Sequence, residues 1–138
     1  MMEVDNTLII YTDGAYSSVK KKGGWGFYCP QYKMRVCSGE YDTTNNRMEM
    51  TAALKALQWI SDSHIPQKNI IIVSDSQYVI QTMAGNYQKK TNQDLWDKID
   101  QEVELLFDKK ITWAHVKGHA GHAENEIVDK LANLCSQI

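Results

Sequence analysis

The chain has 138 residues, 43% of them hydrophobic and 23% charged, which is enough for one well-packed domain over residues 1–138 but not for two. No stretch approaches the roughly 18 continuous apolar residues of a membrane span. Residues 1–5 are acidic where a secretory signal would be basic, so we expect a cytoplasmic protein with no membrane contact. The formal net charge of −2 does not by itself indicate a nucleic-acid partner.

Three strands are predicted in the first part of the chain. An apolar run over residues 7–12 ends at Asp13 and Gly14. Residues 24–29 and 33–39 alternate between apolar and polar side chains, as half-buried strands do. The short separations between these segments predict an antiparallel arrangement.

An amphipathic helix is predicted from Asn46 onward, because apolar residues then recur with helical spacing. Residues 43–45 are available to cap it, and Glu49 lies in its first turn. The apolar face is expected to consist of Met50, Ala53, Leu54, Leu57 and Ile60.

The apolar run over residues 70–73 predicts a strand buried on both faces, with Asp75 at its carboxyl end. Parallel pairing with the first strand would place Asp75 beside Asp13. Helices are predicted over residues 76–83 and 93–107. The second is expected to bury Leu95, Ile99, Val103 and Leu106.

The last part of the chain predicts a fifth strand over residues 111–116, a glycine-rich loop over residues 117–122 and a terminal helix. The order βββα-β-αα-β-α is that of an α/β domain. The core side of the last helix is expected to carry Ile127, Leu131 and Leu134.

The three cysteines, Cys29, Cys37 and Cys135, have no metal-ligand spacing, so we expect reduced and mostly packed thiols. Cys29 and Cys37 could face each other across a hairpin, although a disulfide would be unexpected in the cytoplasm.

Four acidic residues stand in separate, distinctive contexts. Singly, each can be explained as a turn residue, a helix N-terminal charge, an N-cap or a solvated helix acid. Together they suggest a divalent-metal site, because carboxylates are the ligands that hard cations such as Mg²⁺ select. Two such ions can hydrolyse a phosphodiester. The four are Asp13, Glu49, Asp75 and Asp129.

The segments around these acids are long motifs. They are Tyr11-Thr-Asp-Gly-Ala15, Thr43-Thr-Asn-Asn-Arg-Met-Glu49, Asp75-Ser-Gln-Tyr-Val79, Asp94-Leu-Trp96, and Val116-Lys-Gly-His-Ala-Gly-His122 followed by Glu124-Asn-Glu126. In this order they resemble the type 1 ribonuclease H family over nearly the whole chain. The resemblance implies a ribonuclease H-like α/β fold, in which helices flank a five-stranded mixed sheet. It also implies an endonuclease that hydrolyses the RNA strand of RNA/DNA hybrids with two Mg²⁺ ions, which Mn²⁺ can replace. We expect a monomer.

The same resemblance assigns roles to individual residues. Asp13, Glu49, Asp75 and Asp129 correspond to the metal-binding carboxylates, with Asp13 and Asp75 touching both ions. Glu49 would lie on the leaving-group side and Asp129 on the water side. His119 corresponds to a loop histidine that shuttles a proton or helps the product leave, a role that a flexible loop suits.

Five polar residues match family positions that contact the substrate. Recognition of RNA requires short polar groups that sense the 2′-hydroxyl, and Asn45, Asn46 and Gln77 match positions that do this. Thr44 and Asn92 match positions that grip a DNA-strand phosphate. Each could instead be a cap or turn residue. For Gln77 the two interpretations have equal weight, and for Asn92 helix capping is a strong alternative.

The sequence differs from the family pattern at positions that contribute to substrate binding. Residues 86–91 replace a long basic protrusion found in many bacterial members, and Asp42 stands where an arginine is expected in the phosphate pocket. We therefore expect weak, salt-sensitive binding through short basic clusters. One alternative is a nuclease module that needs a polymerase or other partner. Another, disfavoured by the complete set of acids and His119, is an inactive hybrid-binding domain. The clusters are Lys20 to Lys22, Lys33 with Arg35, Lys89-Lys90, Lys109-Lys110 and Lys117.

Overall fold

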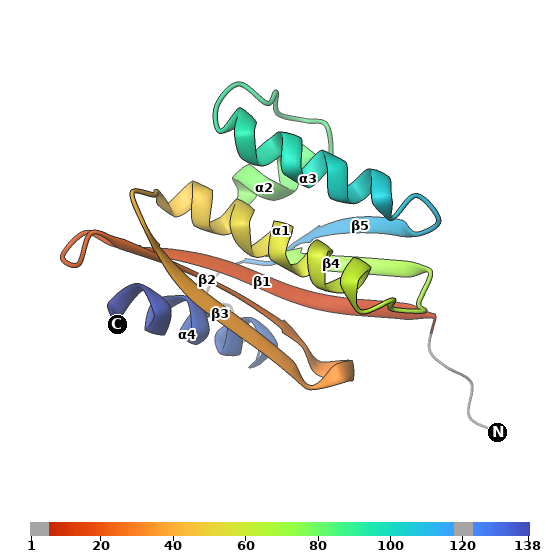
Figure 1. Cartoon of the computed structure of the whole chain (residues 1–138), viewed down its shortest axis with the longest axis horizontal. Helices are drawn as coiled ribbons and strands as arrows, with labels where there is room; N and C mark the ends of the chain where they lie inside the picture. The colour runs from red at the N-terminus through yellow and green to blue at the C-terminus, as the bar shows by residue number, and fades with distance from the viewer. Residues whose placement is uncertain (1–5, 118–122) are drawn as a thin grey trace.

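One mixed sheet is built from β1 (Thr7–Ser17), β2 (Lys22–Cys29), β3 (Met34–Tyr41), β4 (Asn69–Ser74) and β5 (Lys110–His115) (Figure 1). The computed structural model describes residues 6–117 and 123–138. The strand order is β3-β2-β1-β4-β5. β1, β2 and β3 pair antiparallel, whereas β4 pairs parallel with both β1 and β5. The predicted five-stranded mixed sheet is therefore confirmed.

The helices that flank the sheet are α1 (Asn45–Asp62), α2 (Gln77–Met83), α3 (Gln93–Leu105) and α4 (Ala123–Gln137). α1 packs on β1 and β2, and α3 packs on α1. α4 covers the opposite face, where it contacts β1, β2 and β3 (Figure 1). In the part of the chain that the structure describes, no helix is both long enough and apolar enough to cross a membrane.

β1 continues past its predicted end at residue 12 and reaches Ser17. The apolar run stops where predicted, but the following residues remain extended because each pairs with β2, from Asp13 opposite Gly26 to Ser17 opposite Lys22. Backbone pairing therefore extends the strand beyond the point where side-chain hydrophobicity ends. As a result, Asp13 lies within a central strand.

α1 supplies much of the core, as its spacing predicts. All the residues of its predicted apolar face are at most 4% exposed. In β4, by contrast, Ile70 and Ile72 are buried but Ile71 and Val73 are only half-buried. The expectation that β4 is buried on both faces is wrong, because α4 lies over β1, β2 and β3 and leaves the same face of β4 less covered.

The core side of α4 differs from the prediction. Leu134 is 58% exposed, and Ile127 and Leu131 are only half-buried, whereas Val128, Ala132, Cys135 and Ser136 are buried. The reason is a close backbone contact: a Cβ added at Gly24 would lie 2.1 Å from the Ala132 carbonyl oxygen. Small side chains face the sheet there because larger ones would hold the helix away.

Candidate metal centre and substrate contacts

Asp13 lies in the middle of β1 and is 3% exposed. Its neighbour Gly14 faces α1, because a Cβ added at Gly14 would lie 2.3 Å from the backbone nitrogen of Glu49. Side chains alternate along a strand, so Asp13 points to the face that α4 covers. Burial raises the pKa of Asp13, and a hydrogen bond with Asp129 of α4 adds to this effect.

Glu49 comes from α1 and is 5% exposed. The Gly14 amide donates a hydrogen bond to Glu49 Oε1 and another, 2.9 Å long, to Asp13 Oδ1. One backbone N–H therefore orients both carboxylates. This contact does not follow from the predicted strand, which ends at Gly14. The available signal is the glycine itself, because an isolated glycine inside a strand indicates a close backbone approach.

Asp75 follows β4 directly and is half-buried. Its backbone is fixed on one side by Ser76, which caps α2, and on the other by His115, whose Nε2 lies 3.2 Å from the Asp75 carbonyl oxygen. Parallel pairing of β1 with β4 brings Asp75 next to Asp13, as predicted.

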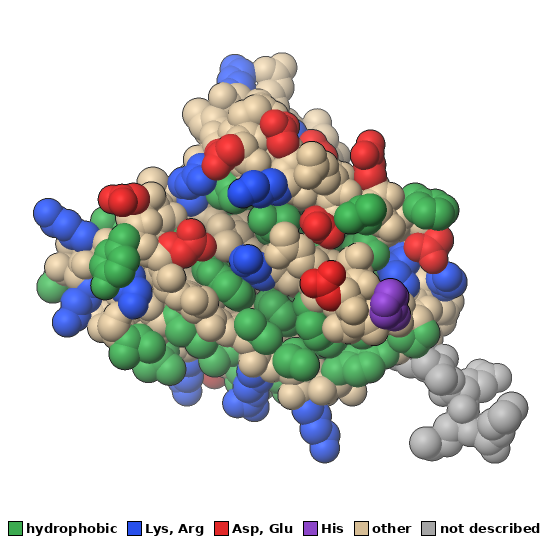
Figure 2. All heavy atoms as spheres, viewed as in Figure 1, with side chains coloured by type: hydrophobic (Ala, Val, Ile, Leu, Met, Phe, Trp, Pro, Cys, Tyr) green, Lys and Arg blue, Asp and Glu red, His purple; other side chains and the backbone are tan. Residues whose placement is uncertain are grey.

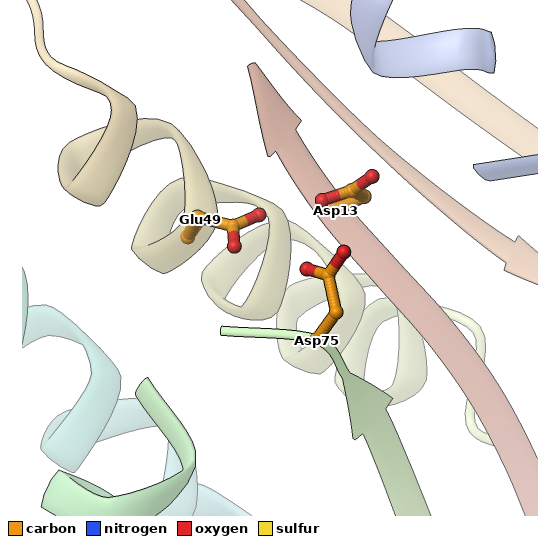
Figure 3. Close-up of side chains that lie close together, drawn as sticks. All are labelled: Asp13, Glu49 and Asp75. Atoms are coloured by element: carbon orange, nitrogen blue, oxygen red, sulfur yellow. The ribbon is translucent and has the colours of Figure 1, made fainter. Parts of the chain in front are cut away.

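The three carboxylates point toward one another from β1, α1 and the end of β4 (Figure 3). One oxygen from each of Asp13, Glu49 and Asp75 lies within 4.8 Å of the other two. Asp129 is outside this mutually close group, although it interacts with Asp13. The structure therefore brings three of the four predicted ligands together and places the fourth beside them.

The charge of this cluster is not balanced by lysine or arginine side chains in the described part of the chain. Over residues 6–117 and 123–138, no lysine or arginine forms an ion pair with Asp13, Glu49 or Asp75. Burial raises the pKa of Asp13, and the neighbouring Glu49 and Asp75 raise it further. Burial also raises the pKa of Glu49. Burial and mutual repulsion therefore disfavour the charged forms of Asp13 and Glu49, and a divalent cation such as Mg²⁺ or Mn²⁺ would offset both effects.

Comparison with known proteins agrees with this geometry. A family model described as RNase H matches residues 5–137. The chain belongs to the ribonuclease H family. It is 37% identical to a ribonuclease HI of Neisseria meningitidis serogroup B, covering 94% of this chain and 95% of that protein. It is 38% identical to a ribonuclease H of Methylococcus capsulatus, covering 96% and 91% respectively. The family assignment made from the sequence motifs is therefore confirmed.

The catalytic histidine expected of a ribonuclease H, His119, lies outside the described residues, as does most of the glycine-rich loop. Its assignment stays a prediction. The loop connects β5 to α4, whose Asp129 lies beside Asp13.

Four of the five predicted ribonuclease H substrate contacts lie where α1 and α2 begin. Thr44 caps α1, since its side chain accepts a 3.1 Å hydrogen bond from the Arg47 amide. Asn45 and Asn46 are exposed in the first turn of α1. Gln77 is the exposed first residue of α2, and its Oε1 accepts a 3.2 Å hydrogen bond from Gln81. Capping therefore explains Thr44, whereas the exposed amides of Asn45 and Asn46 have no capping role.

Asn92 is held by side chains from two other helices. It occupies the N-cap position of α3 in a left-handed conformation, with φ of 59°, but its side chain makes no capping hydrogen bond. The predicted position is therefore correct, whereas side-chain capping is not what this side chain does. Its Oδ1 instead accepts from Arg47 at 3.2 Å, and its Nδ2 donates to the Tyr78 hydroxyl at 3.2 Å. Arg47 also forms a two-point ion pair with Asp94, at 2.9 and 2.7 Å.

Arg47 and Tyr78 are residues that the sequence analysis did not assign. Both lie inside the quoted motifs, so their position was a usable signal. What the sequence did not indicate is that they meet at Asn92.

Proposed function

We propose that this ribonuclease H family member is a single-domain endonuclease that hydrolyses the RNA strand of RNA/DNA hybrids. The observation that carries the proposal is the convergence of Asp13, Glu49 and Asp75 within 4.8 Å, in a chain that matches the family from residue 5 to residue 137. We further propose that it acts as a cytoplasmic monomer and uses two Mg²⁺ ions, for which Mn²⁺ substitutes.

Asp13, Glu49 and Asp75 would hold the metal ions, and Asp129 would complete the set from α4. When bound, such ions supply positive charge that activates the attacking water and relieves the leaving oxygen of charge. The protein contributes position: the Gly14 amide fixes the Glu49 and Asp13 carboxylates before substrate arrives, so little reorganisation is needed in the transition state.

The substrate side of the proposal rests on exposed amides near the carboxylates. Asn45 and Asn46 lie four and three residues before Glu49 on α1, and Gln77 lies two residues after Asp75. Short amide side chains of this kind can donate to and accept from a 2′-hydroxyl. In this proposal, Asn92, held by Arg47 and Tyr78, presents a fixed side chain to a phosphate of the DNA strand.

A nuclease that needs a partner is the second candidate, and the lysines favour it. Figure 2 shows positive side chains at the end of the molecule where the β1–β2 turn lies. Three lysines from the predicted basic clusters, in different parts of the fold, are already engaged within the protein. Lys22 donates to the Ile138 carbonyl oxygen, Lys89 pairs with Asp100 at 2.8 Å, and Lys109 donates to two backbone carbonyls. This reduces the charge available to bind phosphates, so hybrid affinity is expected to be low.

Cleavage of one RNA strand presented in a hybrid, in duplex RNA and alone tests the proposal. With the isolated chain at low salt, we expect Mg²⁺-dependent cutting of the hybrid only, and none with EDTA. The matched control is Asp13→Asn. Cutting of all three substrates would contradict hybrid specificity. If nothing is cut but a calorimetric titration shows metal binding that Asp13→Asn removes, the metal centre is intact and the partner-dependent alternative is correct.

His119→Ala is expected to lower kcat by about 100-fold without abolishing cleavage, which is the usual contribution of a positioned proton-transfer group. KM should change little, because the histidine is not assigned to substrate binding. Steady-state rates over pH 6 to 9 measure both. The exposed His64 provides the control His64→Asn, which should retain the wild-type rate. Complete loss in His119→Ala would contradict an auxiliary role.

A further inference from the structure

Cys29 and Cys37 do not face each other across the β2–β3 hairpin. The strand register places Cys29 opposite Met34 and Cys37 opposite Gly26. The facing arrangement that the sequence allowed does not form, because the tight Pro30–Tyr32 turn, followed by Lys33 with φ of 51°, brings Met34 directly opposite Cys29. Cys29 is fully buried in the hydrophobic core, whereas Cys135 lies on α4, which contacts β3, the strand that carries Cys37.

Cys37 lies beneath the last turns of α4. Gly39, two residues further along β3 on the same face, is so close to the helix that an added Cβ would lie 2.6 Å from the Cys135 carbonyl oxygen. Gly26 is the cross-strand partner of Cys37. A Cβ added at Gly26 would lie 3.1 Å from the Cβ of Leu131, which is one helical turn before Cys135. Because neither glycine carries a side chain, β3 and α4 approach closely here. The Cys37 and Cys135 thiols are close enough to interact with each other.

The two thiols differ in access to solvent. Cys135 is 6% exposed, and its burial together with the Cys37 thiol raises its pKa to about 11. Cys37 lies half-buried on the strand at the edge of the sheet. A reagent can therefore reach Cys37 first, and Cys135 lies behind it.

We propose that Cys37 and Cys135 form a dithiol site that a disulfide oxidant converts into a bond between β3 and α4. The Cys37 thiolate attacks one sulfur of the oxidant and releases the first thiol. Cys135 then loses its proton and attacks the Cys37 sulfur, releasing the second thiol. Two protein thiols are oxidised, one oxidant disulfide is reduced, and two protons leave with the products.

The bond would fasten the end of α4 to the sheet. It closes the chain between residues 37 and 135, and long closed loops restrict the unfolded state most. In a reducing compartment such a bond would form in response to oxidant and reverse afterwards. The site is separate from the carboxylate cluster and does not depend on the proposed nuclease activity.

Oxidised glutathione added to the full-length protein provides the test. After free thiols are blocked and trypsin is added, we expect a disulfide-linked pair of peptides, residues 36–47 and 131–138, because trypsin cuts after Arg35, Arg47 and Lys130. Cys29 should be recovered as a free, blocked thiol in the peptide of residues 23–33. Glutathione retained on Cys37 with Cys135 unlinked, or any link through Cys29, would overturn the proposal.

The thermal midpoint gives a second readout. Oxidation should raise the midpoint of the wild-type protein by at least about 5 °C and should not raise that of Cys37→Ser. Cys29→Ala is the matched control, which removes a thiol but keeps the pair and should retain the rise. An equal rise in Cys37→Ser would contradict the proposed link to α4. No rise in a wild-type sample carrying the bond would contradict the proposal that the bond fastens α4 to the sheet.

Discussion

Asp13→Asn is expected to abolish Mg²⁺-dependent cleavage while making the metal-free protein more stable. Activity should fall by at least about 1,000-fold, equivalent to about 4 kcal/mol of transition-state stabilisation, because Asp13 belongs to the cluster that holds the metal ions in our proposal. The exposed Asp97 on α3 provides the matched control Asp97→Asn, which should keep the wild-type rate. Wild-type activity in Asp13→Asn would exclude the proposed centre.

The stability gain of Asp13→Asn follows from the raised pKa values of Asp13 and Glu49. A carboxyl group with a raised pKa binds its proton more tightly in the folded state than in the unfolded state. The free energy of unfolding therefore falls as pH rises above the ordinary carboxyl pKa of about 4. The asparagine side chain of the variant cannot ionise, so this loss is reduced. At neutral pH we expect Asp13→Asn to be more stable by at least about 1 kcal/mol, since each unit of pKa is about 1.4 kcal/mol.

Denaturant unfolding in EDTA from pH 4 to pH 8 measures this difference. The curves of wild type and Asp13→Asn should converge near pH 4, where the wild-type carboxyl is also protonated, and separate as pH rises. Added Mg²⁺ should reverse the order at neutral pH, because a ligand that binds only the folded state stabilises it. An advantage that is constant over pH would mean that the gain does not come from carboxylate repulsion.

Sequence patterns predicted helices and strands most accurately where burial of side chains determines the structure. α1 is the clearest example, because its apolar residues are spaced for a single face and all of that face is buried. The apolar run before Asp75 likewise predicted β4, and parallel pairing with β1 then brought Asp75 to Asp13. In both cases one local pattern placed a carboxylate at the site.

Hydrophobic patterns failed where contacts between backbones determine the structure. The polar end of β1 remains a strand because it pairs with β2. The sheet-facing side of α4 carries small residues because the helix backbone packs directly against glycines of the sheet. The spacing of hydrophobic residues does not indicate backbone pairing or close backbone packing. Asn92 is a third case: its partners Arg47 and Tyr78 are 45 and 14 residues away, so sequence proximity favoured capping while the fold brought two distant side chains to it.

Gly14→Ala is expected to disrupt the same centre without removing any carboxylate. The added Cβ would lie 2.3 Å from the Glu49 nitrogen, 2.4 Å from the Met48 carbonyl carbon and 2.8 Å from the Glu49 Cα. All three are backbone atoms of α1, so no side-chain rotation relieves the overlap and the helix must move away from β1. We expect the protein to lose about 1–3 kcal/mol of stability, as overpacked sites do.

The catalytic cost of Gly14→Ala should exceed its cost in stability. A displacement of about 1 Å can lower a rate by about 100-fold, and the shift separates Glu49 from both Asp13 and the Gly14 amide that orients it. Gly23→Ala is the matched control, because the three atoms nearest its added Cβ belong to the side chains of Met48 in α1 and of Thr43 just before the helix. These side chains can shift without moving the helix backbone. Cleavage rates and metal titrations at a temperature where both variants remain folded should show a loss of about 100-fold in Gly14→Ala and under about 10-fold in Gly23→Ala. Equal rates for the two would mean that the spacing between β1 and α1 does not set the geometry of the carboxylates.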